Sequence, residues 1–443
     1  MQLQSAGVTS LEMAVLETFA RQRLGATREH WNNVLRRNVK VLRFGGVWRP
    51  ASKSGWRSCA FPLYFASVCG SLLNIIGLDI VRSWLLWGDM TEVTFALVSA
   101  MTNVNGVFKM VHCFRHFETY SLLVSELNGL VALQRPYCEA NGDLMAAFRK
   151  ACRRAARLTI GCLTYMNVLG QMWCVVPLVS HVPPDSRESP LPLVSLPGLH
   201  RENRGWYLFA YLVECHAVFY WNFASLGMDM FFASIMIQVT GQLNILNIRL
   251  TQLRQEGSTE DRASLSRSTG FNLSRNDRHQ ERSANNFARM NSELCECVKH
   301  HQAILKYLEF LERVMSPVVL TQFLCSVVAV CVTLYQITFN PEGSGVIKCA
   351  MFLPIPALQI FVYCWCGHDI MEAGLSVSLA AYSCAWVGVG RRVTSALRIV
   401  MCRAQRPLQL TAGKVYPVNR DTFLSLINAS YTFYTLLRQM RNR

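Results

Sequence analysis

Charged residues are scarce in this chain of 443 residues, and their scarcity excludes the commonest class of protein. Asp, Glu, Lys and Arg make up 16% of the sequence, whereas a soluble globular protein has about 25%. Hydrophobic residues reach 51%, which leaves too few charges for a soluble surface and too few polar residues for a disordered chain. The composition therefore predicts a membrane protein.

The sequence also lacks the motifs of common catalytic and metal sites. It has no Walker loop, no G-x-S-x-G elbow and no H-E-x-x-H pair. Cys364-Trp-Cys366-Gly-His368 has a spacing unlike that of common structural zinc sites, and no second Cys/His pair is near it. We expect no enzyme activity, no cofactor and no metal. The 17 cysteines are an odd number, and many lie in apolar runs, so we expect buried thiols rather than a disulfide framework.

A cleavable signal peptide is not expected at the N-terminus. Glu12 and Glu17 interrupt the region that a signal peptide needs as a continuous apolar core. The chain is therefore expected to begin on the cytosolic side.

What the sequence does contain is a series of long apolar stretches. A helix needs about 20 apolar residues to cross the hydrocarbon core of a bilayer. Six stretches approach or exceed this length. Lys109 in the second is expected near a helix end, from which a lysine reaches the interface, and Pro354 and Pro356 predict a kink in the sixth. The six stretches are residues 58–78, 93–114, 158–182, 205–237, 314–339 and 346–367.

The C-terminal part permits either seven or eight spans. Residues 373–390 are uncharged but rich in Gly, Ser and Ala, and residues 422–437 are uncharged but short. The distribution of positive charge discriminates between the two topologies. With seven spans and a cytosolic N-terminus, 35 of the 44 basic residues lie on the cytosolic side, whereas an eighth span would move residues 391–420 outside. The expected fold is an all-α membrane protein with seven transmembrane helices, an extracellular C-terminus and a cytosolic helical anchor region.

This topology divides the chain into six segments. Within them, residues 255–291 are rich in Ser, Arg and Asn and are expected to be disordered, and the proline-rich connector 181–200 is expected to form an irregular outer lid. The segments are a cytosolic N-terminal segment (1–57), transmembrane helices one to four with the ligand-binding region (58–248), a partly disordered cytosolic loop (249–313), helices five and six (314–367), a cytosolic anchor helix with a basic loop (368–414), and the seventh helix with the C-terminal tail (415–443).

Acidic side chains inside the fourth span need an explanation. A charge within the hydrocarbon region is costly, so Glu214 and Asp229 must have partners or water. A functional role and packing against a neighbouring polar group both remain open at this point.

Aromatic and methionine residues are dense in the outer halves of the second, third and fourth spans. A pocket lined by such side chains binds small apolar ligands through buried area and a few hydrogen bonds. Interfacial aromatic belts and helix packing account for many such residues as well. The candidate ligand contacts are Phe95, Met172, Trp173, Tyr207, Tyr211, Phe219 and Tyr220.

One face of the last helix carries both polar and apolar side chains. Thr432, Leu436 and Met440 recur at every fourth position and share one face, and Gln439 lies beside them. If several copies of the chain met at an axis, this face would form polar and apolar rings around it. An apolar ring closes a channel by excluding water when it is narrow. The same face also fits a packed core.

Residues 361–439 hold a series of short motifs whose order and spacing are specific. They are Tyr363-Cys364, Gly367, Tyr382, Trp386, Arg391-Arg392, the run from Ile399 to Pro407, the run from Leu410 to Lys414, Phe423, and the run from Ser430 to Leu437. In this order and spacing they resemble the insect odorant receptor family. Thr432-Phe433 followed by Gln439 is similar to the terminal Thr-Tyr-x5-Gln signature of the related gustatory receptors, but Phe replaces Tyr, which favours the odorant branch.

The resemblance implies a subunit of a tetrameric, odorant-gated, non-selective cation channel in the plasma membrane of olfactory sensory neurons. A tuning subunit of this family assembles with a shared co-receptor, and the chain resembles a tuning subunit because it lacks the co-receptor's long inserted loop. Leu436 and Met440 would then form the gate, which Gln439 would line. The alternatives are a gustatory receptor of the same superfamily and a G-protein-coupled chemoreceptor. The latter would carry Asp-Arg-Tyr after the third span or Asn-Pro-x2-Tyr in the seventh, and neither is present.

Overall fold

The computed structural model describes residues 34–49, 56–87, 90–179, 204–253, 275–339, 349–387 and 389–441. The expected lid at 181–200 and most of the N-terminal segment lie outside these residues. The elements in chain order are α2 (Arg36–Phe44), α3 (Trp56–Leu85), α4 (Met90–Arg115), α5 (Phe117–Ala140), α6 (Gly142–Val179), α7 (Arg204–Trp221), the π-helix η1 (Asn222–Leu226), α8 (Gly227–Gln252), α10 (Arg275–Phe339), α12 (Pro354–Ser383), α13 (Arg391–Ala404), β1 (Thr411–Ala412), β2 (Tyr416–Pro417) and α14 (Arg420–Arg441).

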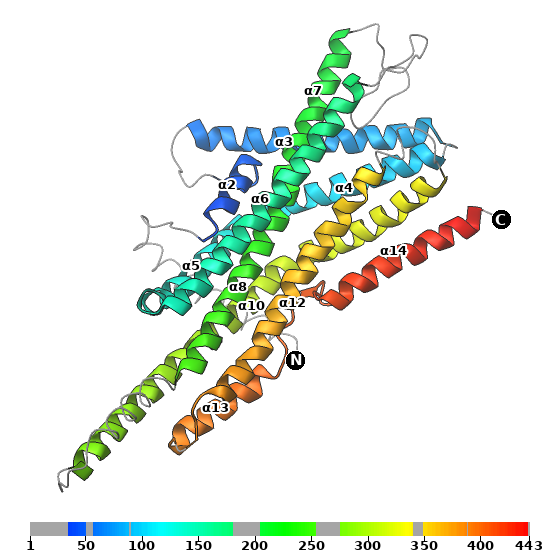
Figure 1. Ribbon diagram of the computed structural model, residues 1–443. Helices are drawn as coiled ribbons and strands as arrows, with labels where there is room; N and C mark the ends of the chain where they lie inside the picture. The colour runs from blue at the N-terminus through cyan, green and yellow to red at the C-terminus, as the bar shows by residue number, and fades with distance from the viewer. Residues whose placement is uncertain are drawn as a thin grey trace, which may run out of the picture.

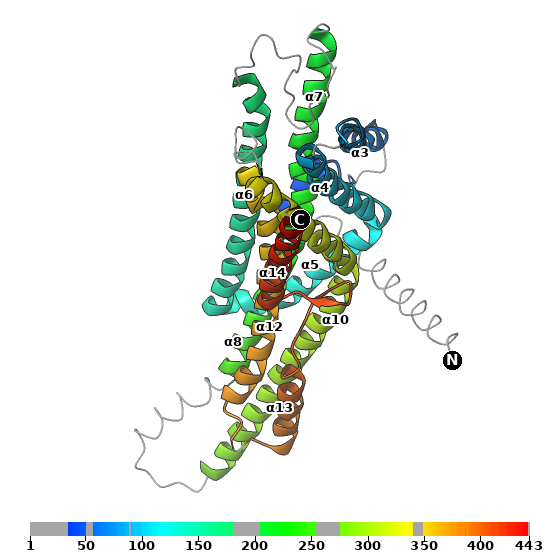
Figure 2. The ribbon, with the colours of Figure 1, turned by 90° about the vertical axis from the view of Figure 1, so that its right-hand side faces the viewer.

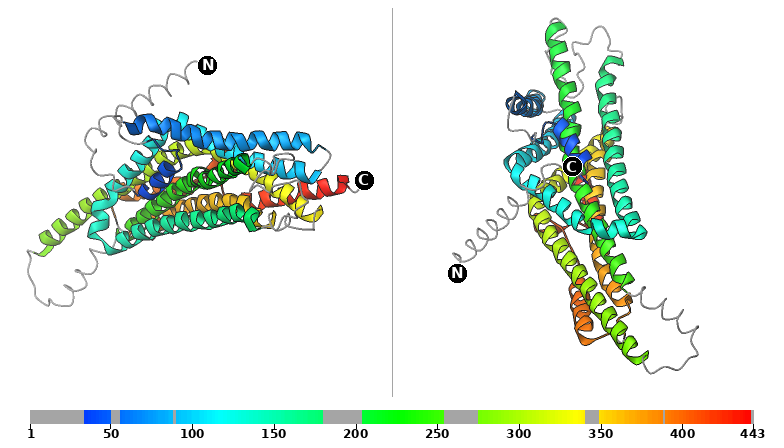
Figure 3. Two further views of the ribbon diagram at one scale, coloured as in Figure 1. Left: turned by 90° about the horizontal axis from the view of Figure 1, so that it is seen from above. Right: turned by 90° about the vertical axis from the view of Figure 1, so that its left-hand side faces the viewer.

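The helices form an elongated bundle (Figure 1). In that view α6, α7 and α8 run steeply along the molecule, and α3 crosses them at a large angle. The second view shows α13 beside α10 at the end of the molecule opposite to α7 (Figure 2). Seen from above, α14 extends to one side of the bundle, so that the C-terminal end of the chain projects from it (Figure 3).

Helix α8 forms the centre of the bundle, and apolar residues occur on all of its faces. Nearly every residue from Gly227 to Leu250 is buried, and α6 and α12 pack against it. Phe231 and Phe232 are fully buried, and the ring of Tyr120 from α5 lies 6.1 and 5.8 Å from their two rings. The core therefore extends from the membrane-spanning helices into α5.

Seven helical segments of the described chain form the predicted bundle: α3, α4, α6, the continuous run of α7, η1 and α8, then α10, α12 and α14. Hydropathy alone finds five helices that are long and apolar enough to cross a membrane. Helices α4 and α14 are not among these five because polar and charged residues are spread along their whole length. In α4 several of those residues, including Asn103, Asn105 and Lys109, face the interior of the bundle.

Two boundaries differ from the sequence-based expectations. Helix α10 is 65 residues long and begins at Arg275, so the expectation of disorder is wrong for residues 275–291. Each residue added to an existing helix gains a hydrogen bond without a new nucleation step, which allows this polar segment to extend a buried helix. In addition, α12 begins at Pro354 after a turn at Leu353, because proline fits the first turn of a helix. It then continues without a break past residue 367 to Ser383.

A short hairpin joins the anchor helix α13 to α14. Strands β1 and β2 pair antiparallel with Ala412 opposite Tyr416. The turn between them contains Gly413 with φ of +61° and Lys414 with φ of +59°. The Gly413 amide donates to the main-chain oxygen of Ser316 at 3.2 Å. The start of α14 is thereby attached to α10.

The cysteines agree with the prediction of free thiols. Sixteen of the seventeen cysteines have described side chains; these sixteen are free, and most of them are buried. Buried thiols of this kind pack as small apolar side chains.

Candidate functional site: a cavity next to a buried polar network

A cavity of about 120 Å³ lies inside the helix bundle. Its wall is mostly apolar, with a small number of amide and hydroxyl groups, as is usual for a site that binds a small molecule. Side chains from α3, α4, α6, α7, η1, α10 and α12 contribute to it. The residues that line it are Ile75, Phe95, Val98, Ser99, Thr102, Asn103, Met166, Leu169, Gly170, Trp173, Ala217, Val218, Trp221, Asn222, Thr333, Gln336, Cys349, Phe352 and Ile355.

Two of the seven predicted ligand contacts line this cavity. Phe95 comes from α4 and Trp173 from α6. Their rings are stacked, with centroids 6.4 Å apart and an angle of 22° between the planes. The two rings provide flat apolar surface against which a small ligand can pack.

Two further predicted contacts, Met172 and Phe219, line a separate groove between α6 and the α7–η1 segment. This groove has a volume of about 990 Å³ and is open to the outside of the bundle. Met172 is half exposed. The structure therefore places these two residues next to the cavity but not in its wall.

The three predicted tyrosines of α7 are not among the residues that line the cavity. The Tyr211 hydroxyl donates to the main-chain oxygen of Cys174 at 2.6 Å, which links α7 to α6 beside Trp173. The Tyr220 ring packs against His216, with centroids 4.5 Å apart, and against other aromatic rings. The Tyr207 ring lies 6.3 Å from that of Tyr211.

Sequence reasoning missed the polar residues of the cavity. Asn103 and Asn222 are buried, with exposed fractions of 8% and 4%. Asn222 begins the π-helix η1, which interrupts the run from α7 to α8. π-Helical turns inside longer helices are frequent at functional sites, and here the turn brings an amide to the cavity. The position of an asparagine within the fourth span was the available sign.

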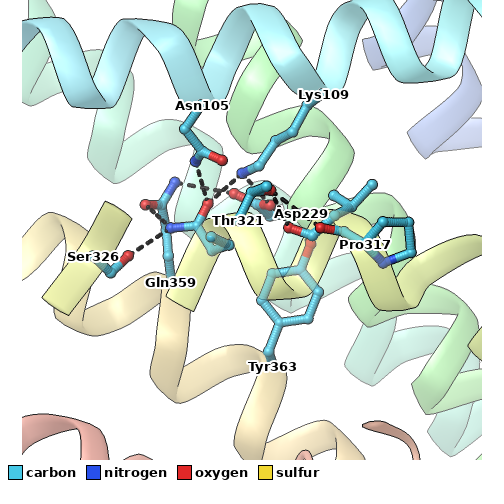
Figure 4. A network of polar contacts seen from close by, with 10 residues as sticks. Asn105, Lys109, Asp229, Pro317, Thr321, Ser326, Gln359 and Tyr363 are labelled. Carbon is cyan, nitrogen blue, oxygen red and sulfur yellow. Dashed lines mark hydrogen bonds and ion pairs between the residues drawn. The ribbon is translucent and has the colours of Figure 1, made fainter. Parts of the chain in front are cut away.

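Asp229 is the centre of a buried polar cluster (Figure 4). Lys109 of α4 approaches its Oδ1 at 2.6 Å, with both side chains almost fully buried. The Tyr363 hydroxyl donates to the same oxygen at 2.8 Å, and Gln359 Nε2 donates to Oδ2 at 3.0 Å. The expectation that Lys109 reaches the membrane interface is therefore wrong, because a carboxylate inside the bundle neutralises its charge.

Gln322 of α10 extends the cluster. Its Oε1 accepts hydrogen bonds from Lys109 and, at 2.7 Å, from Asn105. Its Nε2 donates to Ser326 at 2.7 Å and to Gln359 at 2.8 Å (Figure 4). The cluster thus joins α4, α8, α10 and α12 through charged and neutral hydrogen bonds. It lies next to the cavity, since Ile355 in the cavity wall precedes Gln359 by one turn of α12.

The predicted gate residues lie on the exposed face of α14. One side of this helix packs in the bundle through Thr422, Leu426, Ser430 and Tyr434, which are buried. The Tyr434 hydroxyl is 2.9 Å from Thr338 Oγ1 of α10. The other side carries Thr432, Leu436, Gln439 and Met440, all of which are exposed in the single chain.

Comparison with known proteins identifies the family. The family model described as 7tm Odorant receptor matches residues 89–431. The chain is 24% identical over 411 residues to Odorant receptor Or2 of Anopheles gambiae, covering 91% of this chain and 97% of that protein. It is 23% identical to Odorant receptor 10 of Aedes albopictus, covering 80% and 86% of the two chains.

A solved structure shows the same fold. The olfactory receptor OR5 of Machilis hrabei, in complex with eugenol, superposes with a TM-score of 0.72 at 19% identity. The match covers 92% of this chain and 97% of that receptor. With the family match over most of its length, the chain belongs to the seven-transmembrane odorant receptor family and is a receptor, not an enzyme.

Proposed function

We propose that this protein is the tuning subunit of an odorant-gated, non-selective cation channel. The observation that carries the proposal is the partly open apolar cavity within the helix bundle. A small volatile molecule gains buried apolar contact there, and a few amide groups fix its orientation. Binding opens the channel because the ligand has a higher affinity for the open arrangement than for the closed one.

Among the predicted ligand contacts, Phe95 and Trp173 contact the ligand directly in this proposal. Met172 and Phe219 border the outer groove, from which a volatile dissolved in the membrane reaches the cavity. Tyr211 positions Trp173 through its hydrogen bond to the neighbouring main chain of Cys174. Tyr207 and Tyr220 support the α7 side of the same wall.

The orientation in the membrane follows from charge. The N-terminal segment, the loop 249–313 and the anchor segment 368–414 are cytosolic, because most basic residues lie in or near them. The cavity then lies in the outer half of the bundle. The C-terminal end of α14 is extracellular.

The exposed face of α14 supports assembly around a pore. Leu436 and Met440 are 52% and 67% exposed, and apolar side chains at a shared axis form a constriction that conducts only when it widens and fills with water. Thr432 and Gln439 add polar rings to the same wall. The partners are three further subunits that include the shared co-receptor, in the plasma membrane of olfactory sensory neurons.

The test is current recording in cells that express the chain with and without a co-receptor, across a panel of volatiles. Odorant-evoked currents are expected to persist when G-protein signalling is blocked. Currents that disappear under this block would instead favour the G-protein-coupled alternative. Trp173→Ala should change the rank order of ligands, whereas Gln439→Ala should change ion permeation. Trp206→Ala is the matched control, since Trp206 is 63% exposed and does not line the cavity.

A further inference from the structure

Two arginines from different helices share a single carboxylate where the start of α14 meets α12 beside α6 (Figure 2). Arg154 Nη2 of α6 lies 2.6 Å from Asp369 Oδ2 of α12, and Arg420 Nη2 of α14 lies 3.2 Å from Asp369 Oδ1. The Arg420 Nε atom is buried and has no hydrogen-bond partner among the described residues. One ionised carboxylate neutralises one guanidinium group, so the three side chains together keep one positive charge.

This excess positive charge has no acidic partner nearby. Glu372 of α12 and Asp421 of α14 are the next acidic residues along those two helices, and in the described part of the chain neither forms an ion pair with the two arginines. On α6, five basic residues lie between positions 149 and 157, and no acidic residue follows Asp143 in that helix. The surface around the shared carboxylate therefore attracts anions.

The three charged residues lie at the level where the apolar part of the bundle ends. Arg154, Asp369 and Arg420 are just outside the apolar stretches of the third, sixth and seventh spans, on the side that the distribution of basic residues assigns to the cytosol. The headgroups of the inner leaflet lie at this level, and that leaflet contains the anionic lipids of a cell membrane.

An exposed apolar strip continues from the arginines toward the middle of the membrane. Phe361, Trp365 and Asp369 recur at every fourth position of α12 and share one face. The rings of Phe361 and Trp365 are 5.1 Å apart, and both side chains are 38% exposed. The Arg420 guanidinium lies 4.0 Å from the centre of the Trp365 ring. On α14, Leu424 follows Arg420 by one turn and is exposed. The surface is thus positively charged at one end and apolar along its length.

We propose that this surface binds an anionic phospholipid of the inner leaflet, such as phosphatidylserine. The lipid patch consists of Arg154, Asp369, Arg420, Trp365 and Phe361. Both guanidinium groups donate hydrogen bonds to the phosphate, because their geometry matches phosphate oxygens, and one acyl chain lies along the two rings. Phosphatidylcholine has no net charge and gains less from the excess arginine. The inference rests on the membrane orientation proposed above and does not involve the odorant cavity.

The experiment places brominated lipids beside Trp365. The purified full chain is reconstituted into nanodiscs of phosphatidylcholine with an increasing fraction of phosphatidylserine or phosphatidylcholine that is brominated in the upper part of its acyl chains. Bromine quenches tryptophan only at short range, and the difference from Trp365→Phe isolates the signal of this ring. Exchange of choline lipid for serine lipid at the patch should have an equilibrium constant of about five, as expected for one basic side chain at a membrane surface. Both leaflets of a nanodisc have the same composition, so the test holds for either orientation.

Two variants and a matched control locate the charge that selects the lipid. Arg154→Gln and Arg420→Gln each leave Asp369 with one arginine and no excess charge, so the exchange constant should fall to about one. Arg154→Lys keeps the charge and should retain most of the preference. Arg153→Gln removes the same charge from the same turn of α6, but Arg153 is exposed and its Nε donates to the main-chain oxygen of Arg149 at 3.3 Å. This control should keep the preference for the serine lipid.

Several results would overturn the proposal. Equal exchange constants for the two lipids in the unmodified chain would do so, and so would an equal loss of preference in Arg153→Gln. Absence of quenching of Trp365 by either lipid would mean that another part of the protein, such as a second copy of the chain, covers the patch. Displacement of the brominated lipid by glycerophosphoserine, which has the headgroup without acyl chains, would identify a soluble phosphate compound as the ligand instead.

The lipid test is independent of the channel proposal. It requires no odorant and no current, so its failure leaves the odorant-gated channel in place. The exchange constant of the unmodified chain is decisive even where a variant fails to fold, which size-exclusion chromatography of that variant would report.

Discussion

The buried pair of Lys109 and Asp229 gives a prediction whose size can be worked out from the structure. Removal of one partner leaves an uncompensated charge at a site with 0% and 1% exposure of the two side chains, and such a change costs about 3 to 5 kcal/mol in the free energy of unfolding. Removal of both charges leaves none unpaired. The double variant Lys109→Met, Asp229→Asn should therefore be more stable than the sum of the two single effects predicts, with a coupling energy of about 2 to 3 kcal/mol.

The two single variants should differ. Without Lys109, the Asp229 carboxylate still accepts hydrogen bonds from Tyr363 and Gln359. Without the carboxylate, the ammonium group retains Gln322 as its acceptor among the described residues. We therefore expect Lys109→Met to destabilise the receptor less than Asp229→Asn does.

The assay is reversible unfolding of the purified full chain in mixtures of mild detergent and SDS, followed by tryptophan fluorescence. The pair of Arg135 and Glu139 is the control, because its nitrogen and oxygen are 2.7 Å apart but its side chains are 71% and 55% exposed. Its double-mutant cycle should give at most about 0.5 kcal/mol. If the Lys109–Asp229 cycle is as small as this control, the buried ion pair does not stabilise the bundle and the reasoning fails.

Two further predictions concern the contacts that hold the start of α14 and the hairpin before it. Gly413→Ala should lower the unfolding free energy by more than about 1 kcal/mol, since the left-handed backbone disfavours a side chain and a Cβ would come within 2.4 Å of Leu320. Lys414→Gly is its control and should be near neutral in the same SDS titration, and equal losses at both positions would contradict this account. Asp369→Asn should lower stability by about 1 kcal/mol at low salt, because Asp369 pairs with Arg154 of α6 at 2.6 Å and with α14. That difference should shrink in high salt as the half-exposed arginine is screened, and a salt-independent loss would argue against an electrostatic origin.

Most of the fold could be predicted because a membrane span is a local property of sequence. Long apolar runs such as 314–339 lie inside α10, and the distribution of basic residues rejected an eighth span at 373–390. The interior of the bundle could not be predicted in the same way. Lys109 and Asp229 are 120 residues apart, and nothing in the sequence near either residue identifies the other as its partner.

The candidate site was predicted only in part for a related reason. Aromatic density drew attention to the region around Phe95 and Trp173, which line the cavity. It also included Tyr220, which packs against other rings outside the cavity wall. Which face of a helix looks inward depends on its rotation, and the π-helical turn at Asn222 changes that rotation within a single span. The 3.6-residue periodicity of apolar residues in a helix cannot show where such a change of rotation occurs.

The cavity and the exposed face of α14 are connected through α10. Thr333 lies in the cavity wall, and Thr338 on the next turn of α10 contacts Tyr434 of α14. Nearer the start of α10, Gln322 contacts Lys109 and Gln359, so the helix that supports α14 also belongs to the polar cluster next to the cavity. A ligand can shift an equilibrium only through contacts that differ between two states. Because its hydrogen-bond geometry is specific and its charges are buried, the cluster resists gradual deformation. We therefore expect a ligand that displaces α4 or α12 either to break these hydrogen bonds together or to leave them all in place.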